Sequence, residues 1–338
     1  MPVEKPSIVV GLNAVIIALT DDQPRVLTVS LPEDAPIEGG TDAAGHAGGR
    51  LLEALPTGPL DPAGDRTLEL AVRRWVCAYA DLELGYVEQL YTFGDRFRDP
   101  REEVGGPRVV SAAYLALVRE SQPASGHGAH WRSVYRFFPW EDWRGGRPQV
   151  IDDSIAPALT AWIEAGGSPE ERRLRRVRAG VTFGLGNSPW DGERVLERYE
   201  LLYEMGLVAE AIRDGAGDYL PTADPDRSTG REMAFDHRRI LATAVGRIRA
   251  KIRYRPVVFE LMPETFTLLQ LQRAVEALAG VRLHKQNFRR LVEKGGLVEA
   301  TGRRDYETGG RPAEVFRFRR EVLLERPAPG VGLPGAHR

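Results

Sequence analysis

Cysteine, long apolar runs and metal-ligand spacings are all scarce in this chain of 338 residues. The one cysteine, Cys77, cannot form an internal disulfide or a cysteine-based metal site, which fits a reducing cytoplasm. No apolar stretch reaches the ~20 residues of a membrane-spanning helix. The segment 7–19 lacks a small-residue cleavage site and is interpreted as a strand, not as a signal peptide. His127 and His130 lie in a glycine-rich stretch, for which we expect a solvated loop in preference to a metal site. We expect a cytoplasmic protein without a bound metal.

Charge is unevenly distributed along the chain. Residues 236–326 contain 20 lysines and arginines against 11 aspartates and glutamates, a net charge of +9. The whole chain carries −2, so the rest carries −11. The length predicts two or three domains, and a basic C-terminal part on an acidic body is typical of a nucleic-acid-binding module joined to another domain.

The pattern of residues 254–318 predicts a winged helix-turn-helix. A helical run ends in a glycine (267–280), a second short helix follows (284–296), and two alternating strands flank a glycine-rich turn. The second helix places Phe288, Leu291 and Val292 on one face. Its opposite face is cationic, which suits the phosphate-lined major groove of DNA.

The predicted DNA-binding residues fall into two sets. For base readout we expect residues near the start of the second helix: Lys285, Gln286 and Arg289. For phosphates we expect the helix and wing cations Arg290, Lys294, Arg303, Arg304 and Arg311. The alternative for each is a solvated surface cation. The expected core of the domain is Phe259, Leu261, Phe266, Leu268 and Leu271.

The N-terminal 150 residues have the pattern of an α+β domain. Strand-like alternation predicts five strands: 7–19, 25–31, 86–93, 108–118 and 132–138. Residues 32–65 are rich in glycine, proline and aspartate and are predicted to be loop. A helix is expected over 66–81, because Leu68, Val72, Trp75 and Tyr79 form one apolar stripe.

Residues 151–231 are predicted to be mostly helical. Ser168 to Glu171 have the spacing of a capping box, with proline at the first helical position. A second amphipathic helix is expected over 191–212, and a polar linker over 214–231. The helix that follows is expected to open the DNA-binding part and to end before Pro256.

The N-terminal half resembles a Nudix domain through LPTGPL (55–60), the helix 66–81 and YVEQLYTFGD (86–95). The family's helix carries the pattern Arg-Glu-hydrophobic-x-Glu-Glu, whose glutamates hold Mg²⁺ against a diphosphate. Here the six positions are Arg73, Arg74, Trp75, Val76, Cys77 and Ala78. All three glutamates are replaced, and only Asp65 matches an earlier acidic position. The resemblance therefore implies a nucleotide-binding fold without a hydrolytic centre.

Taken together, the two halves resemble the Nudix-related transcriptional regulators of bacterial NAD metabolism, the NrtR type. The resemblance is strongest in 193–208, 249–280 and 287–302, with 309–318 as the closing strand. It implies a degenerate Nudix domain that senses a nucleotide, commonly ADP-ribose, and a winged helix that represses genes of NAD biosynthesis or salvage. The extra length at 32–65 and 120–190 resembles a longer, NadQ-like branch, for which the implied effectors are ATP or NAD.

The resemblance places candidate effector-binding residues after and on the Nudix helix. They are an aromatic residue for a base and charged residues for a diphosphate: Phe93, Asp95, Arg98, Arg101 and Arg74. The alternative is a structural loop with surface charges, and Arg74 is either a phosphate partner or a substitution without a role. The segment 137–147, with Trp140 and Trp143, either covers the ligand or forms a packed domain edge or dimer contact.

The expected fold class is α+β: a Nudix-like mixed-sheet domain with a degenerate Nudix helix, a helical middle segment and a C-terminal winged helix-turn-helix. The expected domains are 1–150, 151–231 and 232–326, followed by a disordered tail, 327–338. The predicted function is a homodimeric repressor that binds a double-stranded operator under control of ADP-ribose, NAD or ATP, with no catalytic residue and no required cofactor. Two alternatives stay open: a Nudix pyrophosphatase acting on NAD-like or ADP-ribose-like compounds, and a winged helix that contacts protein.

Overall fold

The computed structural model describes most of the chain in two compact units. The described residues are 8–32, 50–80, 83–119, 128–216, 229–306, 312–325 and 330–331. One unit, the sheet unit, consists of Met1–Ala18, Arg25–Phe137 and Arg231–Ala244. The other, the winged-helix unit, consists of Leu19–Pro24, Phe138–Gly230 and Val245–Arg338. Neither unit is continuous in sequence, whereas the three predicted domains are successive segments.

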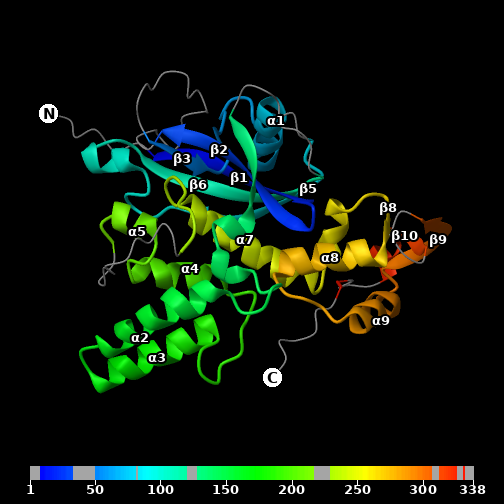
Figure 1. The fold of residues 1–338 in the computed structure, drawn as a ribbon. Helices are drawn as coiled ribbons and strands as arrows, with labels where there is room; N and C mark the ends of the chain where they lie inside the picture. The colour runs from blue at the N-terminus through cyan, green and yellow to red at the C-terminus, as the bar shows by residue number, and fades with distance from the viewer. Residues whose placement is uncertain are drawn as a thin grey trace. The chain divides into compact units, whose positions relative to one another are not determined.

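Among the described residues, the sheet unit is built on one mixed sheet that packs against a long helix (Figure 1). Its strands are β1 (Ile8–Thr20), β2 (Gln23–Pro32), β3 (Leu51–Ala54), β4 (Thr57–Pro59), β5 (Tyr86–Phe93), β6 (Arg108–Leu117) and β7 (Ala129–Ser133). Their order is β3-β2-β1-β6-β5, with β4 paired to β1 and β7 to β2. The central pair, β1 and β6, is parallel, from Ile8 opposite Arg108 to Ile17 opposite Leu117. A mixed sheet of this kind confirms the predicted fold class.

Both faces of the sheet are covered, which explains the almost unbroken apolar sequence of β1. Alternate β1 residues such as Leu12 and Ile16 pack with Val72 and Trp75 of α1 (Leu68–Ala80). The second apolar cluster joins Val29, Leu52 and Val109 to Ala234 and Phe235, which directly precede α7 (His237–Ile252). A strand buried on both faces does not show the alternation of a half-exposed strand.

Two predictions about local structure need correction. The segment 32–65, predicted to be loop, contains β3 and β4, which pair with neighbouring strands through backbone hydrogen bonds that composition does not reveal; residues 33–49 lie outside the described part. The strand predicted at 132–138 is instead β7, followed by a 3₁₀ turn at Val134–Arg136. Phe137 and Phe138 beyond it are buried, so their apolar character comes from core packing and not from a strand.

The middle segment is helical, as predicted, but the single helix expected over 191–212 is two helices separated by a turn. Its helices are α2 (Ala156–Glu164), α3 (Pro169–Phe183), α4 (Val195–Glu204) and α5 (Ala209–Arg213). Ser168 caps α3 by accepting a hydrogen bond from the Glu171 amide, but the Glu171 carboxylate accepts from Gly167 and not from Ser168. The capping box is therefore only half formed. α7 (His237–Ile252) follows, and its first residues, up to Ala244, belong to the sheet unit.

The C-terminal part contains the remaining elements in the order expected for a winged helix (Figure 1). They are β8 (Thr265–Thr267), α8 (Leu268–Ala279), α9 (Lys285–Gly295), β9 (Val298–Asp305), β10 (Ala313–Phe318) and α10 (Val322–Glu325). The three strands form a sheet in the order β8-β10-β9. Within the described part of the chain, no helix has the length and apolar character needed to cross a membrane. The tail predicted at 327–338 lies outside the described residues except for Gly330 and Val331.

Candidate nucleic-acid interface and nucleotide-binding domain

The two helices of the helix-turn-helix begin and end at the residues that the sequence pattern indicates. Thr267 and Gln270 form a full capping box at the start of α8, and Gly280 ends the helix with a φ of 72°. Gly296 ends α9 in the same left-handed conformation, with a φ of 58°. Because glycine adopts this conformation without steric cost, both glycines fix the length of their helix.

The turn between these helices is held by Glu276. Its buried carboxylate accepts hydrogen bonds from Gln272 (2.8 Å), the Leu283 amide (2.9 Å) and Arg282 (2.8 Å). Burial by itself raises the pKa of Glu276, but these donors outweigh burial and hold the pKa below its ordinary value. The carboxylate is therefore charged at neutral pH and fixes the approach of the chain to α9. This glutamate was not among the residues predicted from the sequence, although a glutamate in an otherwise apolar helix face is a recognisable signal.

α9 presents one apolar face and one cationic face. Phe288 and Val292 are buried, whereas Leu291, expected beside them, is only partly buried. The five predicted DNA-contacting residues of this helix are all exposed: Lys285, Gln286, Arg289, Arg290 and Lys294. The helix packs by its apolar side and leaves the polar side to solvent.

The wing consists of β9 and β10, and it carries Arg303 and Arg304 on the exposed part of β9. Arg311, the third predicted wing cation, lies outside the described residues. A groove of about 700 Å³ runs between α9, the start of α8 and the wing. Its lining includes Lys285 and Arg289 from the helix together with Arg303 and Arg304 from the wing. The tertiary structure thus brings two sequence-distant cationic segments to one surface.

The groove cations differ from most other arginines of this unit in lacking a carboxylate partner. Within the described part of the chain, no ion pair or side-chain hydrogen bond is made by Lys285, Arg289, Arg303 or Arg304. By contrast, other arginines of the winged helix are paired within the chain, as in Arg282–Glu276, Arg317–Glu299 and Arg319–Glu325. Charges that the fold leaves unneutralised on one concave surface are available to an anionic partner.

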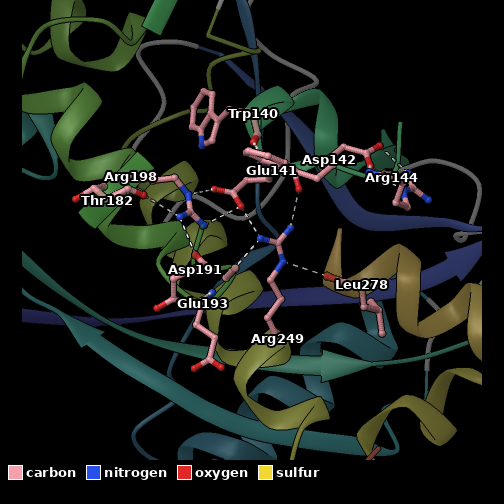
Figure 2. A network of polar contacts seen from close by, with 12 residues as sticks. Trp140, Glu141, Asp142, Arg144, Thr182, Asp191, Glu193, Arg198, Arg249 and Leu278 are labelled. Atoms are coloured by element: carbon pink, nitrogen blue, oxygen red, sulfur yellow. Dashed lines mark hydrogen bonds and ion pairs between the residues drawn. The ribbon is translucent and has the colours of Figure 1, made fainter. Parts of the chain in front are cut away.

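A buried ion network anchors the winged helix to the helical segment. Figure 2 shows the Glu141 carboxylate between Arg198 of α4 and Arg249 of α7. The Arg198 Nε lies 2.5 Å from Glu141 Oε1, and the side chains of Arg198 and Glu141 have no exposed surface. Arg249 also donates to the carbonyl of Leu278, near the end of α8, at 3.2 Å. The positions of α4, α7 and α8 are therefore linked through one carboxylate.

The segment 137–147 packs within the protein. Trp140 is fully buried, and the Trp143 ring lies 4.5 Å from that of Trp190. The Trp143 amide donates to the carbonyl of Gly280, the residue that ends α8. This arrangement supports the packed-edge interpretation of the segment. Its central residue, Glu141, was missed because burial of a carboxylate depends on two arginines distant in sequence.

The arginines of α1, the helix that resembles the Nudix helix, are paired within the sheet unit. Arg74 forms two hydrogen bonds with Asp65, at 2.8 and 2.7 Å, and lowers the pKa of that carboxyl. Arg73 pairs with Glu69 and donates to the carbonyls of Leu84 and Gly85. Among the described residues, no group of three or more His, Cys, Asp or Glu side chains is placed to hold a metal ion. Cys77 is exposed, and the Ala78 side chain lies outside the described part.

The loop after β5 is tied to the start of α7. Arg98, whose side chain is 2% exposed, forms a two-point ion pair with Asp236, at 3.0 and 2.7 Å. Asp95 pairs with Arg239 one turn further along. Phe93 is buried at the end of β5. The described geometry thus places these residues at the junction of the sheet with α7.

Arg101 differs from Arg98 in keeping part of its surface exposed. It contacts the buried Asp99 at 2.7 Å, and its side chain is 36% exposed. Arg74 is 54% exposed. Of the three predicted effector-binding arginines, Arg74 and Arg101 therefore present a charged group to solvent, whereas Arg98 does not.

Comparison with known proteins identifies the C-terminal part and the overall fold. Residues 258–318 match the family described as the NrtR DNA-binding winged helix domain. An ADPR-responsive transcriptional repressor of Acinetobacter baylyi is 40% identical over 87 residues, which are 26% of this chain and 34% of the relative, so the match spans about a third of the relative's length.

Two solved structures of Shewanella oneidensis NrtR extend the likeness to nearly the whole chain. One is the structure of NrtR complexed with a 27mer DNA, and the other is a structure of NrtR. Each is 21% identical to this chain, with TM-scores of 0.54 and 0.53. Each match covers 93% of this chain and 95% of the NrtR chain. At this identity the likeness establishes the fold. The chain therefore has the fold of the Shewanella NrtR structures, and its residues 258–318 match the NrtR DNA-binding winged helix domain.

Proposed function

We propose that this protein is a cytoplasmic transcriptional repressor that binds an operator through α9 and the wing. The observation that carries the proposal is the groove of about 700 Å³ lined by four cations without partners among the described residues. Each cation that reaches a phosphate releases counterions, which gives binding energy and a steep salt dependence. The Acinetobacter relative, described as a transcriptional repressor, and the Shewanella fold crystallised with DNA support the proposal.

The protein works as a homodimer in this proposal. Two recognition helices would then read half-sites about one helical turn, or 34–36 Å, apart. An effector that changes the spacing between the helices changes operator affinity, because only one spacing fits both half-sites. The regulated genes are those of NAD biosynthesis or salvage.

The effector is an adenine nucleotide bound by the Nudix-like domain. ADP-ribose is the first candidate, because the Acinetobacter relative is described as ADPR-responsive; NAD and ATP are the others. We propose that Arg74 and Arg101 contact its diphosphate, since their guanidinium groups are the exposed ones. Phe93 and Arg98 have a structural role in this proposal, because both are buried, and Asp95 holds the loop to α7.

The domain binds without hydrolysing. Metal-assisted cleavage of a pyrophosphate requires several oxygen ligands on the Nudix helix. Here Arg74 occupies one former glutamate position and already neutralises Asp65. We expect no Mg²⁺- or Mn²⁺-dependent turnover of ADP-ribose or NAD. Steady turnover that disappears on mutation of Asp65 would favour the pyrophosphatase alternative.

DNA binding is tested with duplexes selected from a random library by the full-length protein. Arg289→Ala should lower affinity for the selected duplex by about 1–3 kcal/mol and relax specificity at one position. Arg303→Ala should weaken binding to all duplexes alike. It should also reduce the slope of log binding constant against log salt concentration by about one. Arg317→Ala is the matched control, because this wing arginine is already paired with Glu299. Selection of no duplex, or equal effects of all three substitutions, would favour a protein-contacting winged helix instead.

Effector binding is tested by calorimetry and thermal shift with ADP-ribose, NAD and ATP. A ligand present at a hundred times its Kd should stabilise the protein by about 2.7 kcal/mol. Arg74→Ala and Arg101→Ala should weaken binding, whereas Arg173→Ala on α3, whose arginine pairs with Glu170, should not. No heat with any of the three nucleotides at millimolar concentration would refute the sensor proposal.

A further inference from the structure

One acidic residue lies on the cationic face of α9. Lys285, Arg289 and Glu293 follow one another at four-residue intervals, so they share a face of the helix. All three are exposed and line the groove between α9 and the wing. With a rise of about 1.5 Å per residue, Glu293 lies ~6 Å beyond Arg289 along the helix axis.

The Glu293 carboxylate has no partner within the described part of the chain. Its backbone carbonyl accepts from the Gly296 amide, but no hydrogen bond or ion pair reaches its side chain. Arg289 stands at the four-residue spacing that allows a helix ion pair, yet the two side chains are not paired. Elsewhere in this domain glutamates are used to neutralise arginines, as in Glu276–Arg282 and Glu299–Arg317.

A carboxylate in a DNA groove is repelled by the phosphates, so it lowers affinity unless it makes a specific contact. On the major-groove edge, amino groups are offered by cytosine (N4) and adenine (N6), and a carboxylate accepts from them. Guanine offers acceptors that suit arginine. An offset of ~6 Å corresponds to about two base-pair steps of 3.4 Å, so Arg289 and Glu293 can face different base pairs.

We propose that Glu293 is a specificity-determining residue of the DNA site, which accepts a hydrogen bond from the exocyclic amino group of a base about two steps from that read by Arg289. This role rests on the proposed function of the winged helix. Cytosine is the expected base, because its amino group is the usual partner of a glutamate. The residue rejects guanine and thymine at that position, since both present an acceptor to the carboxylate.

The experiment compares the full-length native protein with Glu293→Ala, Glu293→Gln and Glu314→Gln. Glu314 lines the same groove from β10, opposite Arg304, and its substitution removes the same charge from the wing. Duplexes are selected from a random library by each protein, and affinities are measured for the selected duplex, its single-base variants and a scrambled duplex at several salt concentrations.

We expect Glu293→Ala to lower the affinity ratio between the preferred base and the other bases about tenfold or more at one base pair. The base preference at the position contacted by Arg289 should stay the same. Glu293→Gln should shift the same position towards adenine, because an amide reads adenine at two points. Glu314→Gln should tighten binding to all duplexes by one common factor. A native preference for adenine in place of cytosine at the affected position would support the proposed contact.

Two outcomes would overturn the inference. If Glu293→Ala leaves the selected sequence unchanged and tightens all duplexes as Glu314→Gln does, Glu293 is only a repulsive charge. If the native protein selects no duplex, the proposed DNA function itself fails and this role fails with it. Because Glu293 is exposed, circular dichroism and thermal unfolding should match the native protein, which separates a reading defect from a folding defect.

Discussion

Glu141→Gln is expected to be among the most destabilising single changes in the winged-helix unit. The native carboxylate accepts two hydrogen bonds from Arg198, at 2.5 and 3.0 Å, and one from Arg249. Hydrogen bonds to charged groups contribute about 1.5–3 kcal/mol each, which gives an upper range of ~4.5–9 kcal/mol for the three. The glutamine oxygen retains part of this hydrogen-bond energy, and both guanidinium groups still donate hydrogen bonds to backbone carbonyls. The net loss should be about 3–5 kcal/mol, as for other buried pairs deprived of one partner.

The assay is urea unfolding at pH 7, followed by tryptophan fluorescence and far-UV circular dichroism. A matched control is Glu204→Gln, whose native carboxylate pairs with Arg178 at 2.7 Å with both side chains nearly half exposed. An exposed pair of this kind contributes less than about 1 kcal/mol. If Glu141→Gln lowers the free energy of unfolding no more than Glu204→Gln does, the network does not hold the unit together.

The same carboxylate predicts a pH dependence. Burial raises the pKa of Glu141, but the charges of Arg198 and Arg249 outweigh it and hold the pKa below its ordinary value. When the pKa of a carboxyl is lower in the folded than in the unfolded protein, the carboxyl stabilises the fold fully above its pKa in the unfolded protein, about 4.3. This stabilisation is lost as the pH falls through the pKa of the folded protein. The difference in stability between native protein and Glu141→Gln should therefore be constant from pH 7 to about 5 and shrink only in more acidic solution. A difference that already declines between pH 7 and 6 would contradict this.

Two further changes concern the sheet unit. Asp236→Asn should destabilise the sheet unit by about 2 kcal/mol. This is less than the cost for a fully buried pair, because the Asp236 side chain is 17% exposed while that of Arg98 is 2% exposed. Thermal unfolding measures the change, and an unchanged midpoint would argue against the pair. Gly58→Ala should cost about 1–3 kcal/mol, because an added Cβ would lie 2.9 Å from the Trp75 ring. Urea unfolding checks this second change, and a native-like midpoint would mean that the ring can move without cost.

The winged helix could be predicted because its signals are local. Thr267 and Gln270 cap α8, Gly280 and Gly296 end the two helices, and the apolar spacing of α9 identifies its buried face. Each of these features involves residues within one or two helical turns, so it is visible in a single stretch of sequence. The exposure of the predicted α9 cations follows from the same periodicity.

The sheet unit was predicted less completely, because its irregular parts depend on pairing. β3 and β4 lie in a segment whose composition indicates loop, and they are strands only because β2 and β1 offer backbone partners. The apolar run through Phe137 and Phe138 resembles a strand, yet its residues pack into a core as part of a turn. Composition and alternation do not distinguish these cases.

The sequence by itself therefore determined the domain types and the helix boundaries of the DNA-binding part, since both depend on residues close together in the chain. Only the tertiary structure decided which charges are used internally. Glu141 meets an arginine 108 positions away, and Arg98 meets an aspartate 138 positions away. Lys285 and Arg303 keep their charges available because no carboxylate of the described chain is folded against them. Partners of this kind are set by the packing of distant elements, and the free energy of a buried charge depends on those partners more than on its neighbours in sequence.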